Sequence, residues 1–302
     1  MKNQATIRHE VHAVGTGLHS GKLVHMTLRP APPNTGIVFV RTDLHGAYVK
    51  ASVEAIDFEM LQLATTLRNG DVVVQTTEHL LSALFSANVD NVIVEIDGPE
   101  VPIMDGSSAP FLVLLDEAGI KRQPVPAKVL KIVKPFSFEA GGKKVWVTPS
   151  GDFRVSYEIR FDHPLIQRQR KTMNVHSREY EEQVAPARTF GFLRDLDYLK
   201  SKGLIQGGSM DNAIVLDADR ILNESLRLKD EFVSHKILDM IGDLAVAGVR
   251  FQGHFHGYKA GHEMHARFLR ALLAAEDCYV VVQDGATLPA AFAPAGDVPV
   301  AV

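Results

Sequence analysis

The sequence predicts an α+β protein with two similar domains, each a layered unit of sheet and helix. Both halves of the chain begin with short β-rich segments and then continue into helical ones. The length of 302 residues is also more than one hydrophobic core usually organises. We therefore expect domains over 1–122 and 128–280. The charged, proline-bearing stretch 121–128 between them is the predicted linker.

The first half is predicted to run as strands, helix, strand and helix. Residues 5–50 read as short strands broken by turns, among them the glycine-hinged loop GTGLHSGK. A strand at DVVVQ leads into TTEHLLSALFSA, which is apolar nearly all round and is therefore expected to form a buried helix with a Thr cap. NVIVEIDG predicts another strand. SSAPFLVLLDEAG predicts a helix that opens with Ser and Pro and ends at Gly119.

The second half is predicted to repeat this order of elements. VLKIVKPFSFEA, KKVWVTPS and FRVSYEIRF predict three strands, a polar segment follows to about residue 180, and ARTFGFLRDLDYLKSKG predicts a helical region. Short strands at NAIVLDA and RILN precede a long helix from Asp230 to about Ala247. A strand at VRFQGHFHGYKAG and a last helix near 263–275 complete the domain. Small residues, prolines and very few charges predict a disordered tail over 285–302.

Composition excludes several classes of protein. With 46% hydrophobic and 23% charged residues, the chain is of the globular type. The net charge of −4 and the lack of Lys/Arg runs argue against a nucleic-acid partner. A single cysteine, Cys278, leaves only His and carboxylate ligands for a transition metal. Because a signal-peptide core and a transmembrane-length apolar run are also absent, we expect a cytoplasmic, soluble protein without a transmembrane segment.

The segment EFVSHKILDMIGD places His235, Asp239 and Asp243 at steps of four, on one side of the predicted helix. The opposite side is apolar and faces the core. Gly242 and Val246 lie beside His235 where a solvated face would carry long polar residues, so the stripe is expected to be at least half buried. Buried imidazoles and carboxylates need hydrogen bonds, ion pairs or a metal. A metal site and a hydrogen-bonded His/Asp core network both satisfy this pattern.

Two further places combine His with other polar groups. Glu78 and His79 open the predicted buried helix and could reach one ion or water, although Glu78 could instead serve only the helix dipole while His79 packs. In GYKAGHEMH, Lys259 lies between two glycines, and His262 directly follows the second of them. Four histidines lie within twelve residues here, but their spacing fits no standard zinc motif, so we predict no cluster made of these four alone: His254, His256, His262 and His265.

A set of ordered motifs extends across the chain from about residue 4 to 280. They are GTGLHSG (15–21), TTEHLLSAL (76–84), VPIMDGSSAPF (101–111), FDHP (161–164), ARTFGF (187–192), LNE (222–224), DEFVSHKILDMIGD (230–243) and YKAGH (258–262). With these motifs the chain resembles the UDP-3-O-acyl-N-acetylglucosamine deacetylases, the zinc-dependent amidohydrolases of lipid A biosynthesis in Gram-negative bacteria. Several long matches in the same order are far more specific than any one pattern.

The resemblance implies a role for each matching residue. His79, His235 and Asp239 match the ligands of one catalytic Zn²⁺, with a position left for water; Fe²⁺ is an alternative for the same ligands. Glu78 matches the general base. The implied acid and its orienting carboxylate are His262 and Asp243, and Thr189 matches a hydroxyl near the oxyanion. The active site is then expected at the interface of the two domains.

The same resemblance implies substrate contacts with a UDP-sugar that carries an acyl chain. Lys236 and Lys259 match residues around the diphosphate, whereas the positions near the nucleotide are Lys143, Phe161 and Asp195. Leu18 and Phe190 match the mouth of the acyl passage. The family also implies a monomer. One departure is visible after His262: this chain has Glu263 and His265 where the family usually has small residues and asparagines.

Two other functions remain to be compared with this one. A nucleotide-sugar-binding protein that has lost catalysis would show a broken ligand set, whereas every expected ligand, base and acid is present here. A zinc amidase that acts on a different N-acetyl sugar would lack the nucleotide contacts. The sequence therefore predicts an enzyme that releases acetate from UDP-3-O-acyl-N-acetylglucosamine.

Overall fold

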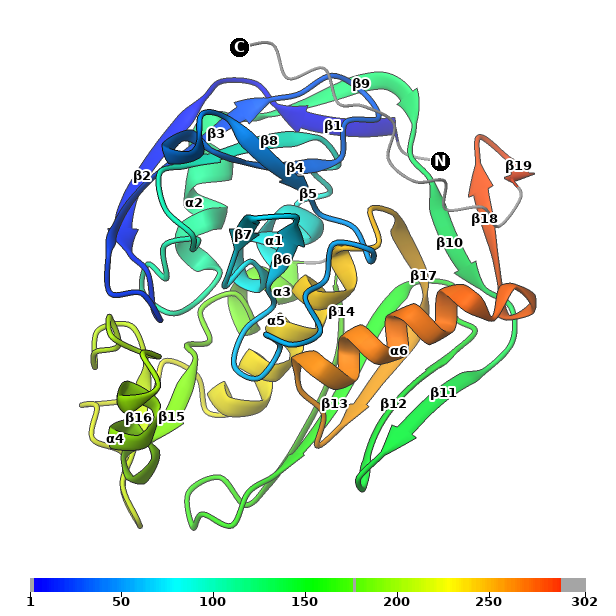
Figure 1. Cartoon of the computed structure of the whole chain (residues 1–302). Helices are drawn as coiled ribbons and strands as arrows, with labels where there is room; N and C mark the ends of the chain where they lie inside the picture. Colours follow the sequence, from blue (N-terminus) through cyan, green and yellow to red (C-terminus); the bar gives the residue numbers. More distant parts are fainter. Residues whose placement is uncertain (1–2, 176–177, 289–302) are drawn as a thin grey trace.

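The structure is a computed structural model that describes residues 3–175 and 178–288 (Figure 1). In the N-terminal half a five-stranded sheet has the order β2-β3-β8-β4-β5, with β4 and β8 parallel and the other pairs antiparallel. Its strands are β2 (Val11–Thr16), β3 (Leu23–Pro30), β4 (Ile37–Arg41), β5 (Ala47–Lys50) and β8 (Val92–Ile96). A small hairpin of β6 (Leu67–Asn69) and β7 (Val72–Val74) lies beside it. These strands confirm the β-rich reading of the first half.

Two helices belong to this half. α1 (Glu78–Ser86) is buried from Glu78 to Phe85, as its all-round apolar sequence predicts. Thr77 occupies the N-cap position as predicted, but its hydroxyl donates to the Thr65 carbonyl oxygen at 3.1 Å and accepts no hydrogen bond from a backbone N–H of the helix. α2 (Ala109–Ala118) has proline in its first turn and ends at Gly119, as predicted, and it packs against α1 and β2.

The predicted linker over 121–128 is wrong for most of its length. Its residues form β9 (Ile120–Pro126), which pairs antiparallel with β1 (Asn3–Ile7). The Gln123 side chain is buried and donates to the Ala31 carbonyl oxygen at 2.8 Å. Proline is tolerated here because β9 pairs on one side only and the register is interrupted near its end.

The C-terminal half contains an eight-stranded sheet in the order β11-β12-β17-β10-β18-β19, from which β13 and β14 branch at β17. Its strands are β10 (Val129–Ile132), β11 (Phe136–Ala140), β12 (Lys143–Thr148), β13 (Phe153–Arg160), β14 (Arg168–Asn174), β17 (Arg250–Tyr258), β18 (Tyr279–Gln283) and β19 (Ala286–Leu288). VLKIVKPFSFEA makes two strands instead of one, because Pro135 interrupts it. β14 occupies part of the stretch read only as polar.

The predicted tail begins too early. Ala286–Leu288 pair with β18 as an antiparallel strand, so the first residues of 285–302 belong to the sheet. The rest of the predicted tail, 289–302, lies outside the described residues. A hairpin of this kind depends on pairing with Tyr279–Gln283, whereas composition reports only the local scarcity of charge.

The remaining helical elements are α3 (Arg178–Gln183), α4 (Leu193–Ser201), α5 (Glu231–Ala245) and α6 (His262–Ala274), with short 3₁₀ turns at Thr42–Leu44 and Glu276–Cys278. A parallel pair of short strands, β15 (Phe190–Phe192) and β16 (Ile214–Leu216), precedes α5. The predicted ARTFGFLRDLDYLKSKG helix is therefore β15 followed by α4. RILN forms a single bridge from Ile221 to Leu216 instead of a strand. The long helix near 231–245 and the last helix are confirmed.

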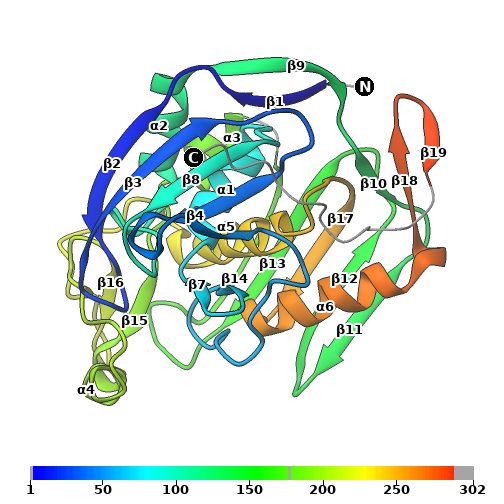
Figure 2. The same cartoon turned by 45° about the horizontal axis from the view of Figure 1, so that its top comes forward.

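Helices α1 and α5 pack against each other between the two large sheets, and α6 lies across β11 and β12 (Figures 1 and 2). Buried apolar residues from both halves form one continuous cluster. Gly242 makes the helix contact possible, because a Cβ there would collide with the Glu78 carbonyl. The α+β architecture is thus confirmed. The close approach of the two helices brings the first turn of α1 against α5.

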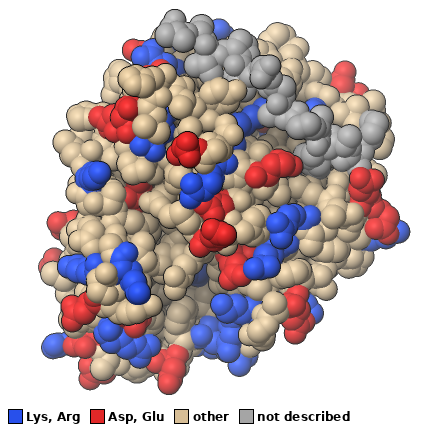
Figure 3. All heavy atoms as spheres, viewed as in Figure 1, with Lys and Arg blue, Asp and Glu red and all other residues tan. Residues whose placement is uncertain are grey.

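The described surface agrees with the composition. On the face drawn in Figure 3, Lys and Arg side chains are interspersed with Asp and Glu side chains. Among the residues that the structure describes, none of the helices has the length and apolar composition needed to cross a membrane.

Candidate metal centre and active site

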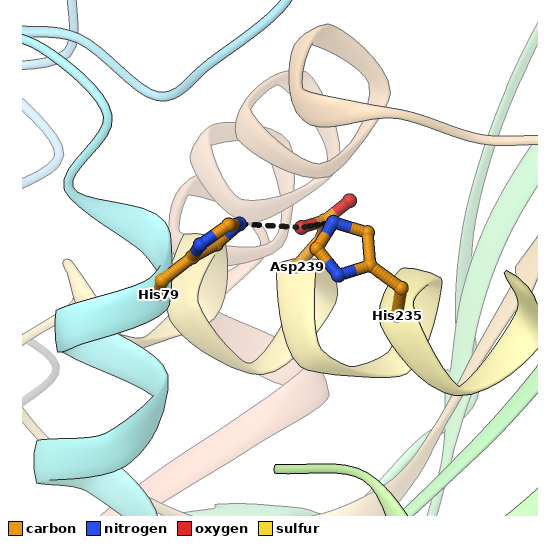
Figure 4. Close-up of side chains that lie close together, drawn as sticks. All are labelled: His79, His235 and Asp239. Atoms are coloured by element: carbon orange, nitrogen blue, oxygen red, sulfur yellow. Dashed lines mark ion pairs between the residues drawn. The ribbon is translucent and has the colours of Figure 1, made fainter. Parts of the chain in front are cut away.

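Two imidazoles and one carboxylate converge where α1 meets α5 (Figure 4). His79 comes from the first turn of α1, and His235 and Asp239 come from successive turns of α5. The Oδ1 atom of Asp239 lies 3.2 Å from His235 Nε2 and 3.8 Å from His79 Nε2. All three side chains are buried. The structure therefore brings together the three residues that the sequence predicts as ligands.

The atoms of this group are arranged as lone-pair donors. His235 Nδ1 donates to the Ala187 carbonyl oxygen at 3.0 Å, so the neutral ring presents an unprotonated Nε2 to Asp239. Asp239 Oδ2 accepts from Lys236 Nζ at 2.6 Å, but Oδ1 is buried without a hydrogen-bond partner among the described residues. Facing lone pairs of this kind are costly unless a cation lies between them. The donor set fits a divalent metal.

The electrostatics support the same assignment. Burial, and after it the neighbouring His235, lower the pKa of His79 to about 3. Burial likewise lowers the pKa of His235. For Asp239, burial alone would raise the pKa, but His235 and Lys236 hold it well below its usual range. At neutral pH the group therefore consists of two neutral imidazoles and one carboxylate, the protonation states that metal ligands require.

A buried ion pair fixes the segment 187–189, which lies beside the three candidate ligands. The Arg188 backbone N–H and Nε both donate to Glu231 Oε1, at 3.0 and 2.9 Å. Glu231 is the first residue of α5, so this pair ties the segment to the helix that carries His235. Ala187 then presents its carbonyl to His235, and Thr189 lines the cavity.

Glu78 lies beside the three candidate ligands, and its carboxyl group has the raised pKa that suits a general base. Its carboxyl is 3% exposed and accepts from the Thr65 backbone N–H at 3.0 Å. Burial raises the pKa of Glu78 to about 7, with Asp243 and Asp239 adding to the rise and His262 opposing it. A carboxyl group with this pKa can both accept and release a proton near neutral pH.

His262, the first residue of α6, has the opposite character. Its Nδ1 lies 2.9 Å from Asp243 Oδ2, and its Nε2 lies 4.0 Å from Asp239 Oδ2. Burial alone would lower the pKa of His262, but Asp243 raises it to about 9. The imidazole is therefore protonated at neutral pH and suited to donate a proton.

These groups open onto a cavity of about 520 Å³. It is lined by the three candidate ligands, by Glu78 and His262, and by five further residues that the sequence predicts: Leu18, Thr189, Phe190, Asp195 and Lys236. Asp243 lies behind His262, as expected of an orienting carboxylate. Lys236, predicted near a diphosphate, is already hydrogen-bonded to Asp239 in this structure.

Three predicted substrate residues do not line the cavity. Lys143 begins β12 and is exposed, and Lys259 Nζ lies 5.7 Å from the centre of the Tyr258 ring. Phe161 packs edge-on against Phe190, with ring centres 5.6 Å apart. These residues could contact only those parts of a substrate that extend outside the cavity.

Sequence reasoning missed other residues of the site. His19 lines the cavity and is 5% exposed, and its Nε2 has no hydrogen-bond partner among the described residues. Thr65 contacts both Glu78 and Asp243, although ATTLRNG carries no signal for it. The apolar wall from α4 did leave a signal, since its three leucines are spaced by three: Leu193, Leu196 and Leu199.

The four histidines near the C-terminus do not form one cluster, as predicted. The His254 and His256 rings lie 3.9 Å apart on β17, where His254 Nε2 contacts Ser156 Oγ at 2.8 Å and His256 stacks on Trp146. Neither belongs to a group of described residues that could hold a metal. His262 and His265 instead meet at Asp243.

Comparisons with known proteins agree with this geometry. A protein-family model described as UDP-3-O-acyl N-acetylglycosamine deacetylase matches residues 4–274. A Pseudomonas entomophila protein named UDP-3-O-acyl-N-acetylglucosamine deacetylase is 45% identical over 97% of this chain and 98% of its own length. Proteins of the same name from Teredinibacter turnerae and Acidithiobacillus ferrooxidans are 45% and 47% identical, each over 93% of this chain and 94% and 93% of their own lengths. By its sequence over nearly its whole length, this chain therefore belongs to the UDP-3-O-acyl N-acetylglycosamine deacetylase family.

Proposed function

We propose that the protein is a zinc-dependent hydrolase that removes the N-acetyl group of UDP-3-O-acyl-N-acetylglucosamine, an early committed step of lipid A synthesis. Membership of a deacetylase family supports the reaction. The observation that carries the proposal is the buried set of His79, His235 and Asp239, whose lone pairs face one another beside a base and an acid.

The proposed metal ligands are these same three residues. A catalytic zinc site typically has three protein ligands of the His and carboxylate type, with one coordination position left for the reaction. Fe²⁺ accepts the same ligands and is the alternative ion. When bound, the cation supplies Lewis-acid chemistry, because it lowers the pKa of water and polarises a carbonyl oxygen.

The side chains of the protein then carry out the proton transfers of the reaction. Glu78, with its raised pKa of about 7, takes a proton from the attacking water on a carboxylate oxygen. The Thr189 hydroxyl donates a hydrogen bond to the oxyanion. His262 gives its Nε2 proton to the amide nitrogen as the C–N bond breaks, so that acetate and a free amine are the products. Asp243 holds the His262 imidazole by its Nδ1–H during this transfer.

The substrate contacts follow the cavity and its surroundings. Leu18 and Phe190 would border the acyl chain, and the apolar wall from α4 would enclose it. Lys236 and Lys259 would meet the diphosphate, which requires Lys236 to exchange its contact with Asp239 for the ligand. Phe161, Asp195 and Lys143 would lie near the nucleotide.

The test compares two substrates with the metal content measured in the same sample. Metal-loaded protein should release acetate from UDP-3-O-acyl-N-acetylglucosamine far faster than from unacylated UDP-N-acetylglucosamine. Equal rates would argue against acyl recognition. Full activity in metal-stripped protein would contradict the metal-dependent mechanism.

The organisation of the protein is part of the same proposal. We propose domains over 1–122 and 128–280 with the active site at their interface, since α1 and α5 come from different halves. From the sequence we also propose a monomer that acts in the cytoplasm. Sedimentation or size-exclusion chromatography coupled to light scattering would reveal any dimer.

A further inference from the structure

The orienting carboxylate Asp243 is bound by more than one imidazole. His265 Nδ1 lies 2.7 Å from Asp243 Oδ2, the same oxygen that contacts His262 Nδ1 at 2.9 Å. The Thr65 hydroxyl donates to the other oxygen, Oδ1. Asp243 and His265 are 2% and 0% exposed. Both oxygens of this buried carboxylate are thus held by side chains from different elements.

The protons of this network can be placed. Burial alone would raise the pKa of Asp243, but His262 and the hydrogen bonds from both imidazoles hold it well below its usual range. A carboxylate only accepts, so His265 Nδ1 carries a proton. Burial lowers the pKa of His265, which keeps the ring neutral and leaves Nε2 with a lone pair.

That lone pair is satisfied by Tyr157, whose hydroxyl lies 2.9 Å from His265 Nε2. Burial raises the pKa of Tyr157 well above its usual value, so the phenol keeps its proton and donates it. The tyrosine is fixed by the sheet: it lies on β13 opposite Gly257 of β17, and a Cβ at Gly257 would collide with the Tyr157 ring. Hydrogen bonds therefore run from Tyr157 to His265 and on to Asp243.

We propose that His265 and Tyr157 are positioning residues for the acid of the reaction. They hold the Asp243 carboxylate so that Oδ2 faces His262 Nδ1, which turns His262 Nε2 toward the cavity. This inference rests on the proposed role of His262 and deepens it. The network anchors Asp243 to the C-terminal sheet through Tyr157 and to the N-terminal half through Thr65.

The position of the two residues predicts which kinetic constant they affect. Neither His265 nor Tyr157 lines the cavity, so neither can contact bound substrate. Loss of either should let the Asp243 carboxylate rotate and weaken its bond to His262, which slows proton transfer without changing substrate binding. A residue with a purely structural role would instead change the stability of the folded protein and leave kcat/KM untouched.

The kinetic test uses metal-loaded protein and one matched control. Tyr157→Phe should lower kcat about 3- to 10-fold, the range expected for one buried hydrogen bond, with KM unchanged. Tyr180→Phe is the control: Tyr180 is also fully buried and its hydroxyl lies 2.7 Å from Ser82 Oγ, away from Asp243. Its kcat should equal that of the wild type. Equal kcat values for the two variants, or a change confined to KM, would overturn the proposal.

Position 265 offers a test by rescue. His265→Leu removes the donor to Asp243 and should lower kcat about 10-fold, in the range seen for supporting hydrogen bonds around catalytic groups. His265→Asn restores an N–H donor of similar reach and should recover most of that loss. Adding Tyr157→Phe to His265→Leu should have no further effect, because the chain is already broken. A full additive loss, or no recovery with Asn, would contradict the network.

A spectroscopic readout separates this inference from the proposed function. In protein labelled with ¹⁵N-histidine, His265 should show a protonated Nδ1 and a hydrogen-bonded Nε2. Tyr157→Phe should move the Nε2 signal toward that of an unbonded lone pair and also perturb Nδ1 of His262, whereas Tyr180→Phe should do neither. If the wild type released no acetate, the proposed function would fail while these spectra still decided the network. Unchanged His262 signals in Tyr157→Phe would overturn the positioning role.

Discussion

Two clusters of the same composition are built around Asp239 and Asp243, which lie one helical turn apart on α5. The first contains His79, His235 and Asp239, and the second contains Asp243, His262 and His265. Each has two imidazoles and one carboxylate, and every member is buried. In the first cluster Asp239 Oδ1 has no hydrogen-bond partner among the described residues, whereas in the second both oxygens of Asp243 accept hydrogen bonds.

The difference lies in where the protons are held. In the first cluster the backbone carbonyl oxygen of Ala187 accepts a hydrogen bond from His235 Nδ1–H, so the ring turns the lone pair of Nε2 inward. In the second cluster both imidazoles turn an Nδ1–H toward the carboxylate. Burial lowers the pKa of His79 to about 3 and also lowers that of His265, whereas Asp243 raises the pKa of His262 to about 9. The same residue types thus form a ligand set or an acid with its support: a backbone carbonyl fixes the tautomer of His235, whereas a carboxylate holds the proton-bearing ring of His262.

The largest effect should come from breaking the first cluster. Asp239→Ala removes the proposed carboxylate ligand, so metal and activity should be lost together, with turnover lower by on the order of 10³-fold or more because the Lewis-acid chemistry that a bound cation would supply is then missing. His79→Ala should behave alike. Metal content by plasma mass spectrometry and acetate release are the measurements. His254→Ala, outside the cavity on β17, is the control and should retain both.

Glu78 tests whether catalysis can be separated from metal binding. Glu78→Ala should keep the metal, because none of the three candidate ligands is changed, yet lower kcat about 10²-fold or more by removing the base. Acetate release and metal content again give the answer. A variant that lost its metal would instead place Glu78 among the ligands.

Breaking the second cluster should give a smaller loss with the metal retained. Asp243→Asn keeps the shape of the side chain but can no longer accept from both imidazoles and Thr65. We expect normal metal content and a kcat lower by about 10- to 100-fold. Loss of metal on this change would show that the two clusters are one site, and would break the comparison.

The first cluster could be predicted from sequence to a greater extent than the second. The steps of four between His235, Asp239 and Asp243 are local, and they place all three on one side of a helix before any packing is known. Glu78 and His79 were already a candidate pair at the start of the predicted buried helix, and the family resemblance then gave them the roles of base and ligand. Thr65 and Tyr157 could not be found in this way, because each reaches the site from a distant element and sits in an unremarkable stretch of sequence.

The errors in the fold have the same origin. The charge and proline of 121–128 are local signals of a linker, but pairing of β9 with β1 is decided across more than a hundred residues. The disordered tail was predicted to begin too early, because β19 is defined only by its pairing with β18. Helices α1, α2 and α5 were predicted well, since their apolar patterns and end signals lie within the segments themselves.

The smallest expected effect is a change in the pH profile. Glu78 must be unprotonated to act as a base, so kcat/KM should fall as the pH drops below its raised pKa of about 7. His262 must be protonated to act as an acid, so the rate should fall again above about 9. A bound cation would move both limbs to lower pH, because it disfavours added protons, and the two groups are close enough for the limbs to belong to the pair. His262→Ala should lower the maximum and remove the alkaline limb; a bell of unchanged shape would show that another group donates the proton, and the contrast between the two clusters would then lose its catalytic meaning.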